Sequence, residues 1–382
     1  MNNPLEQKRA EEYDVLRVIL ILLVVFGHIH YRAMSFGHGE LNFIKDPEIF
    51  FAFQGSFFII LKKIIDAIYS FHMSLFFALS GAVCFIQRKK LKKGFNFIVN
   101  KINRLLVPYL LTGLFFMIPI KYLIGGYKLE EVPGAMLGLI TLTNDSGDFT
   151  FINDQGHLWF LVALFWCFVL FVLLYRLLCS TKQRLLLLII IGIVFNLISP
   201  LPIFNTVTLN LGMKNLIWFI FGFCFGSARL SYIEWSKNNK VLYNSIVIIS
   251  GILVFLNILY CVFLPQLVSL PNYVPPFLLT FIQTLTAGIF LYAISSAIAY
   301  KPKTTNNKMF KTLLKYNMII YLLHDPMNFV ILQISTHYKW ITSGTGIALE
   351  LLLRFAGTII VSILLGYIIN SFKAFAKKII AK

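Results

Sequence analysis

Long apolar segments separated by short polar connections run through the whole chain and decide what it can fold into. Each has the length of a helix that crosses the hydrocarbon core of a bilayer, about 17 to 25 residues. The chain is 58% hydrophobic and 13% charged, with a mean hydropathy of +0.78, whereas soluble globular proteins carry about 25% charged residues. A soluble fold is therefore excluded, and we predict an all-α, polytopic transmembrane helix bundle. Its ten or so spans are expected near residues 15–33, 65–86, 104–122, 157–178, 184–200, 212–229, 243–264, 276–299, 313–334 and 346–370.

Lysine and arginine are distributed unevenly over the connections between these spans. With the N-terminus inside, 25 of the 34 basic residues lie in or beside the cytoplasmic segments and 8 in or beside the outer ones, while Arg354 lies within the last span. Cytoplasmic loops of membrane proteins carry this excess. We therefore expect a multi-pass protein of the cell (inner, cytoplasmic) membrane with both termini cytoplasmic. The net charge of +18 then reflects topology and contact with membrane lipid, and no nucleic-acid partner is expected.

The pattern predicts one membrane domain over residues 1–382 and no soluble domain. Residues 1–14 form a polar cytoplasmic segment with no cleavable signal peptide, and residues 371–382 form a basic cytoplasmic tail. Residues 42–60 are aromatic and are expected to form an interfacial or re-entrant helix, and residues 125–156 an outer loop. No internal repeat of the kind common in transporters is visible.

The first apolar segment keeps ionisable residues that lipid does not tolerate. Between Arg17 and Arg32 lie 14 uncharged residues, which rise only about 21 Å in a helix, so at least one ionisable group sits at membrane depth. His28 follows Arg17 by 11 residues, or three turns plus about 20°, so both lie on one helix face, about 16 Å apart. His28 is thus a candidate for proton transfer, whereas His30 is rotated by about 200° from Arg17. The alternative is a structural histidine bonded to a neighbouring helix.

Polar residues also interrupt later spans. His324 and Asp325 stand directly before Pro326, which would free backbone carbonyl groups that then need polar partners. This group is either a site or purely structural. On its chemistry alone Trp159 fits an interfacial belt better than a substrate contact. The other candidate residues of this kind are His72 and His157.

Lys101 and Arg104 lie one helical turn apart at the inner start of the third span. Such a pair could bind phosphate groups, but on the residues alone charge that only sets topology is the preferred interpretation. The five cysteines are scattered singly, so neither a disulfide framework nor a metal site is expected.

Several of these segments, in order, resemble the acyltransferase-3 family of integral-membrane acyltransferases, which includes sugar O-acetyltransferases. The similar segments are "YDVLRVILILLVVFGH", "FHMSLFFALSG", "KINRLLVPY", "HLWFLVALF" and "YLLHDPM". The chain departs from the family at Lys101, where the family's Arg-x-x-Arg motif begins with arginine, so phosphate recognition there is weaker. It also lacks the SGNH esterase-like domain of some relatives.

The resemblance implies an O-acyltransferase with acyl-CoA, usually acetyl-CoA, as donor. The acceptor would be a hydroxyl of a carbohydrate or glycolipid, such as a cell-surface polysaccharide. His28 and Arg17 would be catalytic, with His28 acting as a base or carrying the acyl group itself. Arg17, Lys101 and Arg104 would bind the charged end of acyl-CoA. The substrate-binding residues would be Trp159, His324, His72 and His157.

The rival function is a membrane transporter or flippase of a lipid-linked glycan, in which intramembrane His and Arg line a substrate path. The sequence leaves open the acceptor, the acyl group, the side of the membrane on which transfer occurs, and whether the protein forms a homo-oligomer.

Overall fold

The computed structural model describes residues 10–36, 39–46, 55–91, 93–124, 128–142, 156–178, 182–204, 208–263, 276–340 and 344–380, and these are nearly all helical. The predicted all-α class is therefore confirmed. In chain order the helices are α1 (Glu11–His28), α3 (Ser56–Tyr69), α4 (His72–Ile86), α5 (Arg88–Leu91), α6 (Gly94–Lys101), α7 (Val107–Thr112), α8 (Ile118–Leu123), α9 (Val132–Thr141), α11 (Trp159–Leu178), α12 (Lys182–Ile198), α13 (Leu209–Asn238), α14 (Lys240–Phe263), α15 (Pro276–Ala299), α16 (Pro302–Thr305), α17 (Lys308–His337) and α18 (Gly344–Ile380).

All ten predicted spans fall on helices, and eight helices of the described chain are long and apolar enough to cross a membrane. The two that miss this criterion are α1 and α12. Helix α1 has three acidic residues in its first turn and Arg17 one turn later, and the apolar part of α12 covers only Leu186–Ile198. Helix α1 is therefore a mostly buried, charged helix inside an apolar bundle.

A short β-hairpin follows α1. Strands β1 (Ala33–Phe36) and β2 (Gly39–Asn42) are antiparallel, with Ala33 opposite Asn42. The prediction of an interfacial helix over 42–60 is wrong for 42–46, and helix α3 begins only at Ser56, while residues 47–54 lie outside the described residues. A hairpin pairs its own backbone groups as a helix does, so apolar composition alone did not distinguish the two.

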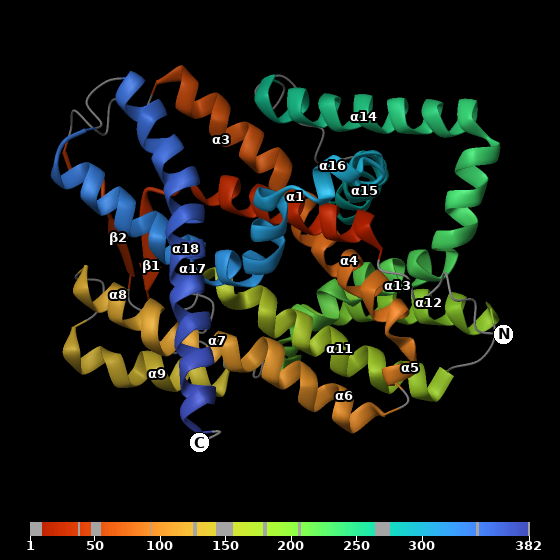
Figure 1. Ribbon diagram of the computed structural model, residues 1–382, viewed down its shortest axis with the longest axis horizontal. Coiled ribbons are helices and arrows are strands. Elements are labelled where there is room, and N and C mark those ends of the chain that lie inside the picture. Colours follow the sequence, from red (N-terminus) through yellow and green to blue (C-terminus); the bar gives the residue numbers. More distant parts are fainter. Residues whose placement is uncertain are drawn as a thin grey trace.

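The expected outer loop over 125–156 contains a helix. Helix α9 covers Val132–Thr141 after the short 3-10 turn Leu129–Glu131, so the loop prediction is wrong there. The Asn- and Asp-rich stretch over 143–155 lies outside the described residues. At the other end, the basic tail expected after residue 370 continues α18 to Ile380 and extends away from the bundle (Figure 1).

The third span is a chain of short helices, α6, α7 and α8, joined by the π-helical turns Ile102–Leu106 and Gly113–Met117. Each π turn stands directly before a helical segment whose second residue is proline, Pro108 or Pro119. Proline donates no hydrogen bond and clashes with the carbonyl four residues earlier, and a wider turn accommodates it.

Helix α1 runs through the centre of the molecule, and α14 lies along one edge (Figure 1). Helices α4, α15 and α17 all pack against α1. Helices α4 and α13 pack most closely: a methyl group added at Gly222 would lie 1.7 Å from the backbone oxygen of Ala78. Small residues that let backbones approach are the usual way helices associate in membranes.

Candidate active site

A cavity of about 770 Å³ lies where segments of α1, α4, α11 and α17 meet. Most of its walls are made by side chains of helices that are distant in sequence. Five of the eight residues that the sequence predicted for the site line this cavity: His28, His72, His157, Trp159 and His324.

His28 ends α1 and is half-buried in the cavity wall. Its Nδ1 atom lies 2.8 Å from the backbone oxygen of Val24, one turn earlier. A carbonyl oxygen can only accept, so Nδ1 carries the proton and donates it. In the neutral ring, Nε2 is left with a lone pair, which is the state required of a base or a nucleophile.

His72 and His324 repeat this arrangement on two other helices. Nδ1 of His72 donates to the oxygen of Ile68 at 2.9 Å, and Nδ1 of His324 donates to the oxygen of Tyr321 at 2.6 Å. Both side chains are fully buried, and neither Nε2 atom has a hydrogen-bond partner among the described residues. The ring centroid of His324 lies 4.4 Å from that of His28. Three histidines that line one cavity therefore each use Nδ1 as a donor to backbone, and the Nε2 atoms of His72 and His324 are buried beside it.

His157 is held from both sides by α17. Its Nε2 donates to the oxygen of Leu322 at 3.0 Å, and its Nδ1 lies 3.3 Å from the Asp325 carboxylate. Leu322 precedes Pro326 by four residues, so its carbonyl is the one that the proline leaves without a helical partner. The prediction that Pro326 frees a carbonyl in need of a polar partner is confirmed, and that partner is His157. The hydroxyl of Tyr321 donates to the backbone oxygen of His157 as well.

Sequence reasoning did not select Tyr69, which lines the cavity beside His28. Its hydroxyl lies 3.3 Å from Nδ1 of His28 and 3.1 Å from the hydroxyl of Tyr31. Gly27 makes room for the ring, because a methyl group at that position would lie 2.8 Å from it. The glycine directly before the histidine was the one available signal in the sequence.

Two lysines that were also not selected line the same cavity. Lys121 at the end of the third span is 1% exposed, and Lys214 near the start of α13 is exposed. Both were counted only as charges that flank spans. Their position adds positive charge to a wall that also holds the Asp325 carboxylate, the imidazole rings of four candidate residues and several aromatic and aliphatic side chains.

Arg17 lies three turns before His28 and does not line the cavity. Its guanidinium pairs with Asp14 at 3.5 Å, and 36% of its side chain is exposed. His30 lines a different cavity of about 360 Å³, next to Arg32 and the β-hairpin. This separation agrees with the helical phase, which predicted that His30 and His28 point in different directions.

Lys101 and Arg104 are also outside the cavity lining, and they point differently from each other. The ammonium of Lys101 lies 3.7 Å from the centre of the Phe168 ring and 4.9 Å from that of Phe97, whereas Arg104 is exposed. The π-helical turn Ile102–Leu106 begins between the two residues and changes the spacing of an ordinary helical turn.

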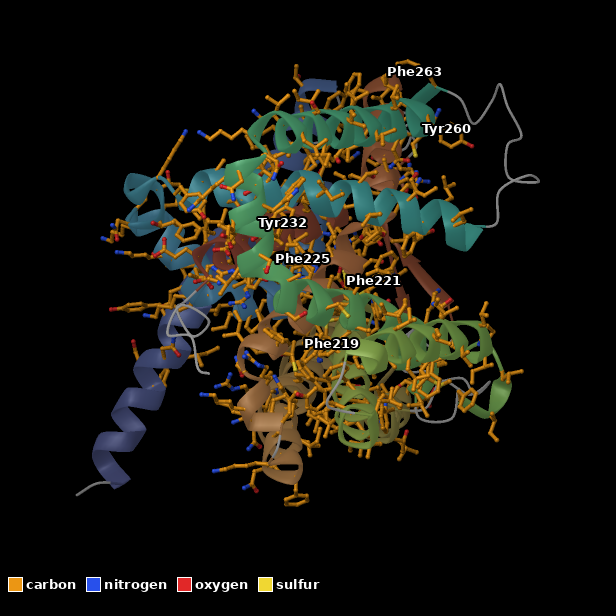
Figure 2. The ribbon with its side chains drawn as sticks, turned by 90° about the vertical axis from the view of Figure 1, so that its right-hand side faces the viewer. Phe219, Phe221, Phe225, Tyr232, Tyr260 and Phe263 are labelled. Atoms are coloured by element: carbon orange, nitrogen blue, oxygen red, sulfur yellow. The ribbon has the colours of Figure 1, made fainter. Side chains whose placement is uncertain are left out.

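A second cavity of about 210 Å³ lies between α1, α4, α13 and α15, and its lining is mostly apolar. Figure 2 shows three of its aromatic residues, Phe221, Phe225 and Tyr232, along α13. Leu16 lines this second cavity, while Val24 and His28 line the first. Leu16, Leu20, Val24 and His28 recur every four residues, in a row that turns around α1 by about 40° per step. The fully buried Leu20 thus lies between the two cavities.

Among the described residues no group of three or more histidine, cysteine, aspartate or glutamate side chains is arranged to hold a metal ion. Comparison with protein families matches residues 11–370 to the family described as an acyltransferase domain. No curated protein and no solved structure matches the chain. We call the cavity lined by His28, His72, His157 and His324 the histidine cavity. The matched range contains all the residues that line it and all eight candidate residues.

Proposed function

This chain belongs to the acyltransferase-3 family, and from that premise we propose the reaction of its histidine cavity. It is a membrane acyltransferase, and we propose that it moves an acetyl or similarly short acyl group from cytoplasmic acyl-CoA to a hydroxyl of a carbohydrate or glycolipid. A cell-surface polysaccharide is the acceptor we favour. The observation that carries this proposal is the set of acceptor nitrogens that His28, His72 and His324 offer to one cavity.

In the proposed reaction Nε2 of His28 takes the proton of the acceptor hydroxyl as its oxygen attacks the thioester carbonyl. The tetrahedral intermediate then expels the CoA thiolate, which leaves as the thiol when His28 returns the proton. The ring needs no tautomer change before it acts, because the bond from Nδ1 to Val24 already leaves Nε2 unprotonated. In a variant of this route Nε2 attacks the thioester first and carries the acyl group until the hydroxyl arrives.

The unpartnered Nε2 atoms of His72 and His324 favour an acceptor with several hydroxyl groups. A buried acceptor atom without a donor is costly, and hydroxyl groups of a bound sugar would supply the donors. Trp159 and the ring of Tyr321 line the same cavity and offer apolar faces for a sugar ring. His157 would hold His324 and Tyr321 in place through its contacts with α17.

For the donor we propose that Arg17, Lys101 and Arg104 attract the phosphate groups of acyl-CoA at the cytoplasmic side. The long, thin pantetheine arm would then lie along the face of α1 that lines the apolar cavity. That side continues along a row of residues that winds from Leu16 past Leu20 to His28. Holding the thioester near Nε2 would supply much of the rate gain by proximity.

We also propose that both termini face the cytoplasm of the inner membrane, from the 25-to-8 distribution of basic residues. Single cysteines placed in residues 125–156 and in the tail after Lys373 should be labelled from opposite sides by an impermeant maleimide. Labelling of both from the same side would contradict this orientation.

Two measurements test the proposed reaction. Purified protein in detergent should hydrolyse or exchange the acyl group of radiolabelled acetyl-CoA, and His28→Ala should not. Mass spectra of surface glycans should lose an acetyl-sized mass increment when the gene is deleted and regain it when the gene is restored. If the parent protein leaves acetyl-CoA unchanged but moves a lipid-linked glycan across vesicle membranes, the rival transporter function is correct.

A further inference from the structure

A buried polar network joins α17 and α18 to the end of α1 that carries His28. The guanidinium of Arg354 is fully buried in α18 and donates from Nε to the side-chain oxygen of Asn328 at 2.6 Å. The amide nitrogen of Asn328, on α17, then donates to the backbone oxygen of His28 at 2.9 Å. A second guanidinium nitrogen donates to the backbone oxygen of Tyr31 at 2.6 Å. Side chains of α17 and α18 thus bind the backbone at His28 and at Tyr31, two residues that line the cavity.

One of these oxygens, that of His28, belongs to the last turn of α1, where carbonyl groups have no intrahelical partner. The other, that of Tyr31, lies three residues beyond the helix end, and the backbone N–H of Tyr31 donates to the oxygen of His28 at 3.3 Å. Helix α1 ends at His28, inside the protein, where water is scarce and an unpaired carbonyl is costly. A cation is also favourable at this end, because the helix dipole is negative there. Arg354 supplies the charge and the donor to Tyr31, and Asn328 supplies the donor to His28.

The cost of burying Arg354 indicates that its role is specific. Its Nη1 atom lies 3.3 Å from Glu350, one turn earlier on α18, and both side chains are at most 1% exposed. Buried ion pairs often add little net stability, since desolvation offsets their attraction. Ionisable residues inside membrane helices usually mark functional sites.

Asn328 stands one turn after His324 on α17. Its side-chain amide therefore connects the helix that carries His324 to His28, whose ring lies next to that of His324. We infer that Asn328 and Arg354 are positioning residues, which fix the last turn of α1 and thereby hold Nε2 of His28 in its place for acyl transfer. The inference rests on the proposed function only for its kinetic consequence. Its structural consequence, a fixed end of α1, is independent of the reaction.

Hydrogen exchange tests the structural consequence first. In Asn328→Ala, amides at the end of α1 and in the first residues after it should exchange several-fold faster, while amides in α4 and α13 keep the parent rate. The matched control is Thr358→Val, one turn beyond Arg354 on α18, where a fully buried hydroxyl has no partner among the described residues. It should leave exchange at the end of α1 unchanged. Uniform acceleration in every helix, or no change at the end of α1, would overturn the inference whether or not the protein is an acyltransferase.

Kinetics test the second consequence. Asn328→Ala should lower kcat about 10- to 100-fold, because small misplacements of a reacting group have such costs, with KM for acetyl-CoA within about threefold of the parent value. In a His28→Ala background the same substitution should lower the residual rate no further, because the residue it positions is absent. Arg354→Lys, which keeps the charge but loses the planar fork, should lose less activity than Arg354→Met. If Asn328→Ala lowers kcat by the same factor in the parent protein and in His28→Ala, the network does not act through His28. The same conclusion follows if folded Asn328→Ala keeps the kcat of the parent protein.

A parent protein that transfers no acyl group would contradict the proposed function alone, since hydrogen exchange still decides the positioning role.

Discussion

Helices α14 and α17 are both long enough to cross a membrane, yet they lie in opposite environments. In their most apolar stretches 11% of α14 is buried, against 61% of α17. Helix α14, along the edge of the molecule in Figure 1, is nevertheless the more apolar of the two. In a bilayer the apolar surface has lipid as its favourable neighbour, so hydrophobicity does not drive a helix inward. The helix with the polar residues is the one that must be enclosed.

The polar side chains of α17 also account for its contacts. Asn317 donates to the backbone oxygen of Arg17 at 3.4 Å, and Asn328 donates to that of His28 at 2.9 Å, so this helix is bonded to α1 at two levels. On α14 the described contacts of this kind involve Asn257, which lies 3.5 Å from the hydroxyl of Ser70 and accepts from Gln283. Function should therefore depend on the interior helices far more than on α14.

The largest effect is expected from His28→Ala. Loss of a general base lowers rates by about 10²- to 10⁴-fold, and the substituted protein should still fold and bind acyl-CoA. His30→Ala, which changes a residue in the neighbouring cavity, is the matched control and should be mild. Transfer rates of purified proteins measure the difference, and a His28→Ala rate within a few-fold of the parent would disprove the mechanism.

A large loss of stability is expected from Gly222→Ala. The added methyl group meets the backbone of Ala78 at 1.7 Å, and backbone cannot move aside as a side chain can. We expect a cost of about 1–3 kcal/mol or more, seen as a lower melting temperature in detergent. Gly251→Ala on α14 is the comparison, because the nearest atom, at 2.8 Å, belongs to the side chain of Phe290 and not to backbone. Equal losses of stability in Gly222→Ala and Gly251→Ala would show that an added methyl group is no better tolerated on α14, at the edge, than on α13, in the interior.

A smaller effect is expected from substitution of Lys101 and Arg104, two of the basic residues proposed to attract acyl-CoA at the cytoplasmic side. Lys101→Ala and Arg104→Ala should raise KM for acyl-CoA a few-fold while lowering kcat less, since binding far from the reacting atoms is shared by ground and transition states. The control substrate is a short acyl-pantetheine without the nucleotide, whose KM should not change. If KM rises equally for both substrates, these residues serve topology or packing and not phosphate binding.

The smallest effect is expected on the outer face of α14. Ile252 is 52% exposed, so Ile252→Ala should change stability by no more than about 0.5 kcal/mol. Leu20→Ala, at a fully buried position of α1, should cost about 2–5 kcal/mol. Thermal unfolding followed by tryptophan fluorescence compares the two, and similar losses would mean that α14 is covered by a partner.

Much of the candidate site follows from local sequence. The carbonyl left free by Pro326 is a consequence of helical geometry within one turn. His28 and His30 line different cavities, as expected, although α1 ends at His28 and His30 lies two residues beyond it. The apolar lengths of the spans likewise required helices. Within residues 42–46 the sequence prediction was wrong, because a hairpin and an interfacial helix both satisfy their backbones in apolar surroundings.

What the sequence by itself determined is therefore the long apolar helices, the family and the histidines that interrupt the apolar spans. Only the tertiary structure decided which of those histidines meet, and that Asn328 and Arg354 close on the end of α1. The partners in that network are about 300 residues apart in the chain, and no local periodicity connects them. The sequence showed Arg354 as a charge within the last apolar span, but not its pairing with Glu350. Which carbonyl groups Arg354 would bind depended on how the helices pack, because a buried charge is stabilised by whatever polar atoms the fold brings within hydrogen-bond distance.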